Sequence, residues 1–305
     1  MSLIRRIASI IPTVFGVLLL TFLLVHLVPG DPVEVMLGES ASGADRQALR
    51  AELGLDRPLP VQFGEYLMRL ARGDFGVSLH GRTPIAELLK ARFPATVRLA
   101  LLALVMAITV GVPLGVVAAL RLRQWPDRWA SLTALTLSAM PHFWLGPLLM
   151  LVFSLWLGWL PVSGMEAPGA IVLPALTLAC GLTAILTRMT RASLLEVLNE
   201  DFVRTARAKG LPEKVVVLRH ALRAALLPVI TIVGLQLGSL LAGAVITETV
   251  FGWDGIGRLL VESIEKRDYP VTQACVLVVA LTYVLVNLLT DLLYRRVDPR
   301  IRGAA

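Results

Sequence analysis

Charged residues are scarce in this chain. Asp, Glu, Lys and Arg make up 17% of its 305 residues, whereas apolar residues make up 56%. Soluble domains carry about 25% charged residues, and their apolar positions recur with the period of a helix or a strand. Here the apolar residues come in unbroken runs. The composition therefore excludes an ordinary soluble globule and indicates an integral membrane protein.

Cysteine is nearly absent as well. Cys180 and Cys275 both lie within apolar runs, so the sequence carries no disulfide framework and no cysteine metal site of readable spacing. The four histidines stand far apart and form no HExxH pair, which argues against a local zinc motif. We expect no metal site in this chain.

Groups that could supply energy or catalysis are also missing. None of the four lysines follows Gly and precedes Ser or Thr, so there is no phosphate-binding P-loop. The apolar runs hold almost no ionisable residues, whereas proton- and sodium-coupled carriers normally place such groups in the membrane. The rival interpretation is a stand-alone secondary carrier or channel, but we find no inverted repeats that would support it. A third interpretation is an intramembrane enzyme, but we find no nucleophile–base constellation for it.

Six apolar runs approach the roughly 20 residues that a helix needs to cross ~30 Å of hydrocarbon. They are residues 7–28, 99–120, 130–157, 171–187, 224–247 and 271–294. The first is too long for the apolar core of a signal peptide, typically about 7 to 15 residues, and no small-x-small cleavage site follows it. Backbone groups in lipid must bond within their own segment, so we predict an all-α protein with six transmembrane helices.

Basic residues are distributed unequally between the two sides of the membrane. Short loops and termini on one side hold seventeen Lys and Arg, and the short loops on the other side hold three. Residues 29–98 are set aside because loops longer than about 60 residues cross regardless of charge. The positive-inside rule then places both termini in the cytoplasm. This topology accounts for the net charge of +7 without any binding of nucleic acid.

The spans contain small and polar residues that predict close helix packing and a cavity. Gly111 with Gly115, and Gly234 with Gly238, form GxxxG steps that allow helix backbones to approach closely. An amide or hydroxyl facing lipid would lack partners, so the polar side chains of these spans are expected to face a translocation path. They are Gln236, Ser239, Asn287 and Thr290.

The longest predicted cytoplasmic loop covers residues 188–223. Residues 193–208 are rich in helix formers with helically spaced apolar positions, Gly210 supplies a C-terminal stop, and Pro212 with Glu213 opens the next helix. The pattern predicts a helical elbow that projects from the membrane. A basic amphipathic segment often lies on lipid, but its place between two spans favours docking on a protein.

At this point the sequence resembles a known family. The strings DFVRTARAKGL at residues 201–211 and RHALRAALLPV at residues 219–229 resemble the coupling loop of binding-protein-dependent ABC transporter permeases. The similarity is greatest to the first permease subunit of the dipeptide, oligopeptide, glutathione and nickel importers. Further matching strings are VPGDP at 28–32, LGLDRPLPVQF at 53–63, GDFGVSL at 73–79, MPHFWLG at 140–146, LGWLPVSG at 157–164, ETVFGWDGIGRLL at 248–260, RDYPVTQA at 267–274 and DLLYRRVDPRIR at 291–302.

The broader permease pattern has an EAA triplet, a Gly four residues after its last Ala, and a later LP. This chain keeps Ala206, Gly210 and the LP at residues 227–228, but has Arg204 and Thr205 where Glu and Ala would stand. Peptide and nickel permeases share that departure, so it narrows the resemblance to their subfamily.

The resemblance implies the type I ABC importer permease fold and a set of coupling residues. The coupling helix would sit in a groove of a cytoplasmic ATPase, with Arg204, Arg207 and Lys209 meeting acidic groups and Phe202, Ala206 and Leu211 filling the groove. The implied coupling residues are Asp201, Phe202, Arg204, Thr205, Ala206, Arg207, Ala208, Lys209, Gly210 and Leu211.

The resemblance also implies the organisation and partners of the chain. Residues 1–28 would form the N-terminus and first span. Residues 29–98 would form a small extracytoplasmic segment, with short helices at 45–53 and 61–72, that contacts a substrate-binding protein. Residues 99–305 would form the permease core, and residues 248–270 a re-entrant lip or gate.

The implied partners are a second homologous permease in a heterodimer, two cytoplasmic ATPases, an extracytoplasmic binding protein and membrane lipid. The ATPases would bind ATP and Mg²⁺, so this chain would bind no cofactor. The location would be the bacterial inner membrane. Di- or oligopeptides, glutathione and nickel chelates all remain open as substrates.

Overall fold

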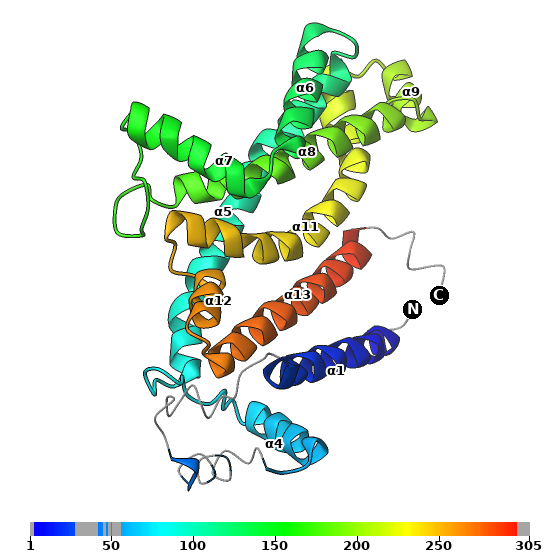
Figure 1. The fold of residues 1–305 in the computed structure, drawn as a ribbon. Helices are drawn as coiled ribbons and strands as arrows, with labels where there is room; N and C mark the ends of the chain where they lie inside the picture. Colours follow the sequence, from blue (N-terminus) through cyan, green and yellow to red (C-terminus); the bar gives the residue numbers. More distant parts are fainter. Residues whose placement is uncertain (1–2, 28–41, 45–46, 48–49, 51–55, 298–305) are drawn as a thin grey trace. The chain divides into compact units, whose positions relative to one another are not determined.

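The computed structural model describes residues 3–27, 42–44, 47, 50 and 56–297, and these are almost entirely helical, with no strand among them. Figure 1 shows the helices coloured in chain order, from blue at the N-terminus to red at the C-terminus. They are α1 (Leu3–Leu27), α4 (Leu59–Ala71), α5 (Ile85–Leu120), α6 (Trp125–Ala139), α7 (His142–Leu149), the π-helix η1 (Met150–Trp156), α8 (Val172–Val197), α9 (Asp201–Ala208), α10 (Glu213–Val215), the π-helix η2 (Val216–Ala221), α11 (Leu222–Phe251), α12 (Ile256–Glu265) and α13 (Tyr269–Val297).

The predicted spans correspond to helices of the structure. Within the described residues, four helical segments are long and apolar enough to cross a membrane, and the bent pair of α6 with α7 and η1 makes a fifth. The apolar stretch Ile10–Leu23 of α1 matches the first predicted span. The prediction of an all-α membrane fold is confirmed.

Three helix boundaries differ from the prediction. α5 begins at Ile85, fourteen residues before the predicted second span, because amphipathic turns precede its apolar part. The third span is not one helix: Met140 and Pro141 adopt extended ψ angles of 123° and 138°, which ends α6 and starts α7. A residue before proline is driven away from the helical region, and the proline nitrogen has no hydrogen to donate, so the chain breaks there.

The third difference concerns the helix predicted at residues 193–208. α8 continues the fourth span to Val197, and Glu200, with ψ 150°, separates it from α9. Hydropathy ends the span at Thr187, but helix formation continues through the more polar turns that follow.

The helix predicted at residues 61–72 is confirmed as α4, whereas the one at 45–53 lies mostly outside the described residues. The VPGDP string at 28–32 and the final residues of the string at 291–302 also lie outside them.

The chain divides into two compact units. The first comprises Met1–Ala95 and Asp254–Val284, and the second comprises Thr96–Trp253 and Leu285–Ala305. α5 and α13 therefore each contribute residues to both units. The predicted segments 1–28, 29–98 and 99–305 were defined by their position relative to the membrane, and that division stays a prediction.

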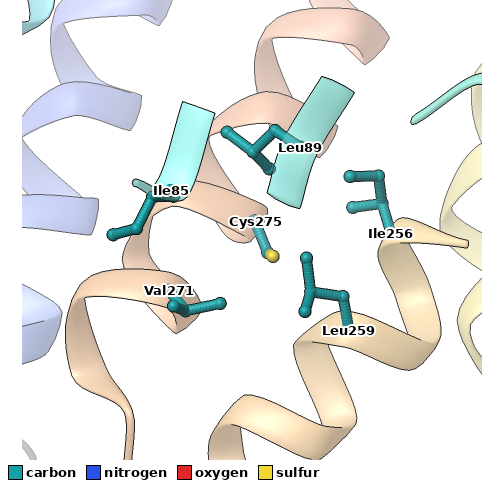
Figure 2. Close-up of a cluster of buried hydrophobic side chains, with 7 residues drawn as sticks. Ile85, Leu89, Ile256, Leu259, Val271 and Cys275 are labelled. Atoms are coloured by element: carbon teal, nitrogen blue, oxygen red, sulfur yellow. The ribbon is translucent and has the colours of Figure 1, made fainter. Parts of the chain in front are cut away.

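The first unit has an apolar cluster at the meeting point of α5, α12 and α13. Figure 2 shows its side chains pointing toward one another. Its members are Ile85, Leu89, Ile256, Leu259, Val271, Ala274 and Cys275. Asp268, which is 4% exposed and precedes α13, accepts a hydrogen bond from the Ser78 hydroxyl, so the loop before α5 is held to the start of α13. Residues 248–270, predicted as a lip or gate, contain α12 and contribute to this cluster.

The second unit is organised around α8. Fourteen of its residues are buried, and it packs against α6, α7 and α11. Since a helix that is buried on most of its surface must present small and apolar residues all round, the Ala, Leu and Thr content of α8 suits this central position. The elbow at α9 and the polar residues of α11 both belong to this unit.

Candidate functional site

The elbow is formed by a short helix between two sharp changes of backbone direction. Glu200 precedes α9, and its carbonyl accepts hydrogen bonds from the backbone N–H groups of Val203 (3.1 Å) and Arg204 (3.2 Å). Gly210 follows α9 with φ +75°, the left-handed conformation that commonly ends helices. Pro212 then precedes α10, which begins at Glu213, one residue after the predicted helix start.

One face of α9 is buried against its own chain. Val203 is 0% exposed and Ala206 is 5% exposed, and both join a cluster with the end of α5, the end of α8, η2 and the start of α11. Its other buried members are Ala119, Leu194, Val216, Ala221 and Ala225. The expectation that the Ala206 side chain fills a partner's groove is therefore wrong. Ala206 instead fixes α9 to the helices that lead into the membrane.

The opposite face of α9 is exposed and mixes apolar with basic side chains. Phe202 of α9 is 46% exposed, and Leu211, just beyond the Gly210 turn, is 37% exposed. The other exposed residues of the predicted coupling set are Asp201, Arg204, Thr205, Arg207, Ala208, Lys209 and Gly210. The elbow thus presents a surface suited to a partner that has both an apolar pocket and acidic groups.

Two of the arginines on this surface already have acidic neighbours. Arg207 donates two hydrogen bonds to the Glu213 carboxylate, at 2.8 and 3.2 Å, and Arg204 donates one to Asp201 at 3.3 Å. The hydrogen bond from Arg207 lowers the pKa of Glu213 and raises that of Arg207 itself. The pair is therefore complete at neutral pH and is lost only as the pH falls through the lowered pKa of Glu213. It joins the two sides of the Gly210 turn.

A further ion pair, which was not identified from the sequence, joins α6 to α8. Asp127, in the first turn of α6, is 5% exposed and accepts hydrogen bonds from Arg191 Nε (2.6 Å) and Nη2 (3.0 Å) of α8. The backbone N–H of Arg123 donates to the same carboxylate at 2.8 Å. Since α8 leads directly to α9, this bidentate pair fixes the position of α6 beside the helix that carries the elbow.

A cavity of ≈360 Å³ lies between α6, α8 and α11. Gln236 and Ser239, both predicted to face a translocation path, line it. Thr290 does not: its side chain packs against Gly234, where an added Cβ would lie 1.9 Å from the threonine methyl. Asn287 is not among the lining residues either, and its buried Oδ1 has no hydrogen-bond partner within the described structure. The structure thus brings together two of the four predicted path residues.

Another buried polar residue was not predicted. Glu248, near the end of α11, is 0% exposed and accepts a hydrogen bond from the Thr96 hydroxyl at 2.6 Å. Sequence reasoning placed Glu248 in a loop because the apolar run ends at Thr247, whereas the helix extends to Phe251. Within the described part of the chain no cluster of three or more His, Cys, Asp or Glu side chains could hold a metal ion.

The small residues of α5 make the close helix contact that the sequence predicts. The Thr187 hydroxyl of α8 lies 3.2 Å from the Gly111 carbonyl oxygen. A Cβ on Gly115 would lie 2.6 Å from the Thr190 Cβ and 2.7 Å from the Thr187 carbonyl oxygen. The backbones can approach this closely only because neither glycine has a side chain.

Substituting Gly115 by alanine is therefore expected to destabilise the protein by about 1 to 3 kcal/mol, because the added methyl group meets backbone atoms that cannot move independently. Gly64→Ala is the matched control, since a Cβ at Gly64 in α4 would meet nothing within 4 Å. Thermal unfolding in detergent measures both variants. Equal midpoints for Gly115→Ala and the wild type would contradict the close contact.

Comparisons with known proteins identify the class of protein to which this fold and this elbow belong. Residues 111–303 match the family described as "Binding-protein-dependent transport system inner membrane component". Residues 1–100 match its N-terminal counterpart, described as "Binding-prot-dependent transport system membrane comp, N-term". The chain belongs to this family: it is a multi-pass inner-membrane permease subunit of an ABC importer, which works with ATPase and binding-protein subunits.

Among curated relatives, the glutathione transport system permease protein GsiC of Escherichia coli K12 is 46% identical over 299 residues, covering 98% of each chain. GsiC of Pectobacterium atrosepticum is also 46% identical over the same length. The inward-facing MetNI methionine ABC transporter has a similar fold, with a TM-score of 0.60, 19% identity, and coverage of 69% of this chain and 96% of that one. An amino acid ABC transporter crystallised with histidines gives a TM-score of 0.54 at 19% identity, with coverage of 69% and 94%.

Proposed function

We propose that this chain forms half of the translocation path of an ATP-driven importer of small peptides, with glutathione as a substrate. The observation that carries the proposal is the 46% identity to glutathione permeases along 98% of both chains. A second, homologous permease completes the path in a heterodimer. Energy comes from ATP and Mg²⁺ bound by the partner ATPases, and this chain binds neither.

The elbow is the point at which the ATPases act on this chain. The buried face of α9 joins it to α5, α8 and α11, so a force applied to its exposed face is transmitted to three spans at once. Short loops and termini on the side of the elbow hold seventeen Lys and Arg, whereas short loops on the other side hold three. This difference supports placing the elbow and both termini in the cytoplasm. Phe202 and Leu211 supply apolar anchors, and Arg204 and Lys209 supply positive charge for an acidic rim.

Transport by the reconstituted complex tests this function. The chain is co-expressed with its partner permease and ATPases, purified, placed in liposomes and supplied with its binding protein. ATP-dependent accumulation of radiolabelled glutathione is expected, and excess unlabelled dipeptide measures how far the specificity extends to other peptides. Purification of this chain without an ATPase, or accumulation that is independent of ATP, would overturn the proposal.

Replacing Phe202 by serine is expected to weaken the association with the ATPase several-fold, because the variant loses a large apolar anchor from the exposed face of α9. The control is Met68→Ser, which removes a 56% exposed apolar side chain from α4. Titration of the purified permease pair with the ATPase measures both affinities. If the two variants bind equally well, Phe202 is not an anchor.

A further inference from the structure

The cavity of the second unit carries a single formal charge. Of the nine residues that line it, only Arg188 is ionised at neutral pH, and none is acidic. The polar members are Gln236, Ser239 and Ser138, and the remainder are apolar or glycine. An anion entering this cavity would therefore meet one cation and several hydrogen-bonding groups, with no like charge to oppose it.

The arrangement along α8 places that charge at one end of an apolar wall. Lining residues of α8 occur at 178, 181, 182, 185 and 188, the spacing of one helix face. Ten residues of helix span about 15 Å, with Arg188 at the end nearer the elbow. Gln236 and Ser239 line the cavity from one face of α11, three residues apart.

Arg188 differs from its neighbour Arg191. Arg191 is engaged with Asp127, whereas none of the ion pairs formed within the described residues involves Arg188. The Arg188 side chain is exposed in this chain. Its guanidinium is therefore available to an incoming group, and a planar guanidinium fits a carboxylate through two parallel hydrogen bonds.

We propose that this cavity is a substrate subsite in which Arg188 binds the carboxylate of a transported peptide while Gln236 and Ser239 bond to its amide groups. The inference rests on the proposed function, which makes peptides the substrates. A volume of ≈360 Å³ falls in the range of about 300 to 1,000 Å³ that is usual for small-molecule sites. An extended tripeptide spans about 10 Å, which is less than the apolar wall of α8.

The test measures binding to the permease–ATPase complex in nanodiscs without its binding protein, so that the selectivity of that protein does not enter. Radiolabelled glutathione is titrated against wild type, Arg188→Gln and Arg188→Lys. We expect Arg188→Gln to weaken binding by about tenfold or more, the usual effect of losing a hydrogen bond to a charged group. Arg188→Lys keeps the charge without the planar fork, and an intermediate loss is expected.

Arg128→Gln is the matched control, because Arg128 is an exposed arginine of α6 that does not line the cavity. Unchanged binding in this variant excludes a general effect of removing positive charge. Glutathione monoethyl ester, which lacks one carboxylate, provides a second readout. Arg188→Gln is expected to reduce the preference for the free acid over the ester.

The proposal is overturned by undetectable glutathione binding by wild type at millimolar concentration. Equal affinity of wild type and Arg188→Gln, or equal losses for Arg188→Gln and Arg128→Gln, would also overturn it. A lipid phosphate is the other anion that Arg188 could meet, so the titration is repeated in phosphatidylcholine and phosphatidylglycerol nanodiscs. An effect of Arg188→Gln that depends on the lipid alone also overturns it. Glutathione uptake by the complete wild-type importer is measured in parallel, and its absence would reject the proposed function itself.

Discussion

Substituting Gly210 by valine is expected to reduce ATP-dependent uptake by about tenfold or more. Gly210 has φ +75°, and nothing lies within 4 Å of the position that a Cβ would take, so the substitution acts on backbone conformation and not through a clash. The left-handed conformation costs an L-residue about 1 to 2 kcal/mol, and a β-branched residue tolerates it least. Each 1.4 kcal/mol changes a conformational equilibrium tenfold.

The predicted consequence is a displaced turn between α9 and α10. If residue 210 leaves the left-handed region, α9 no longer ends where it does, and the Arg207–Glu213 pair across the turn is lost. Leu211, which follows the turn, would then be displaced relative to α9 and to Phe202, the other apolar anchor proposed for the ATPase. Uptake is therefore expected to fall while the chain still inserts and folds, because the buried face of α9 is unchanged.

Gly210→Asn is the matched control for this experiment. Asparagine is the residue that most often replaces glycine at the left-handed position after a helix, so substantial uptake is expected to remain. Uptake into proteoliposomes and substrate-stimulated ATPase activity are measured together for both variants. Wild-type values of both quantities in Gly210→Val would show that the turn does not transmit the ATPase movement.

Replacing Asp127 by asparagine is expected to lower the stability of the protein by about 2 to 4 kcal/mol. Exposed ion pairs contribute about 0 to 1 kcal/mol, whereas removal of one partner from a buried pair costs about 3 to 5 kcal/mol. The Asp127 side chain is 6% exposed but that of Arg191 is 30% exposed, so the pair belongs between these limits. The variant leaves Arg191 without its anionic partner.

Glu65→Gln is the control, because the Arg57–Glu65 pair is exposed on both sides, at 55% and 44%. It is expected to change stability by less than about 1 kcal/mol. Thermal unfolding of the purified complex in detergent compares the two variants, and Asp127→Asn combined with Arg191→Gln is expected to recover part of the loss. If Asp127→Asn unfolds at the wild-type midpoint, the pair does not hold α6 to α8.

Hydropathy located the spans correctly where a span depends only on a continuous run of apolar residues. The fifth span was predicted at residues 224–247 and corresponds to α11, Leu222–Phe251, because lipid requires a continuous apolar helix. The same method ended the fourth span at Thr187, although α8 continues to Val197. Leaving the apolar region removes the hydropathy signal, but it does not interrupt the backbone hydrogen bonds.

The candidate site was predictable only in part, for a similar reason. Gln236 and Ser239 lie three residues apart on one helix, so a single orientation of α11 brings both to the cavity. Asn287 and Thr290 belong to a different helix, and the rotation of that helix decides whether they reach it. Gly234 receives the Thr290 side chain, so Thr290 fills a helix contact.

The amino-acid order alone was sufficient for the membrane class, the approximate spans and the glycine that ends α9, because each depends on hydrogen bonds and side chains within a few turns. The family followed from the resemblance of strings along the whole chain. Packing in three dimensions decided that Ala206 is buried, that Asp127 meets Arg191 sixty-four residues away, and that Arg188 borders a cavity. These facts depend on how helices distant in sequence rotate and approach, and local patterns carry no information about such rotation.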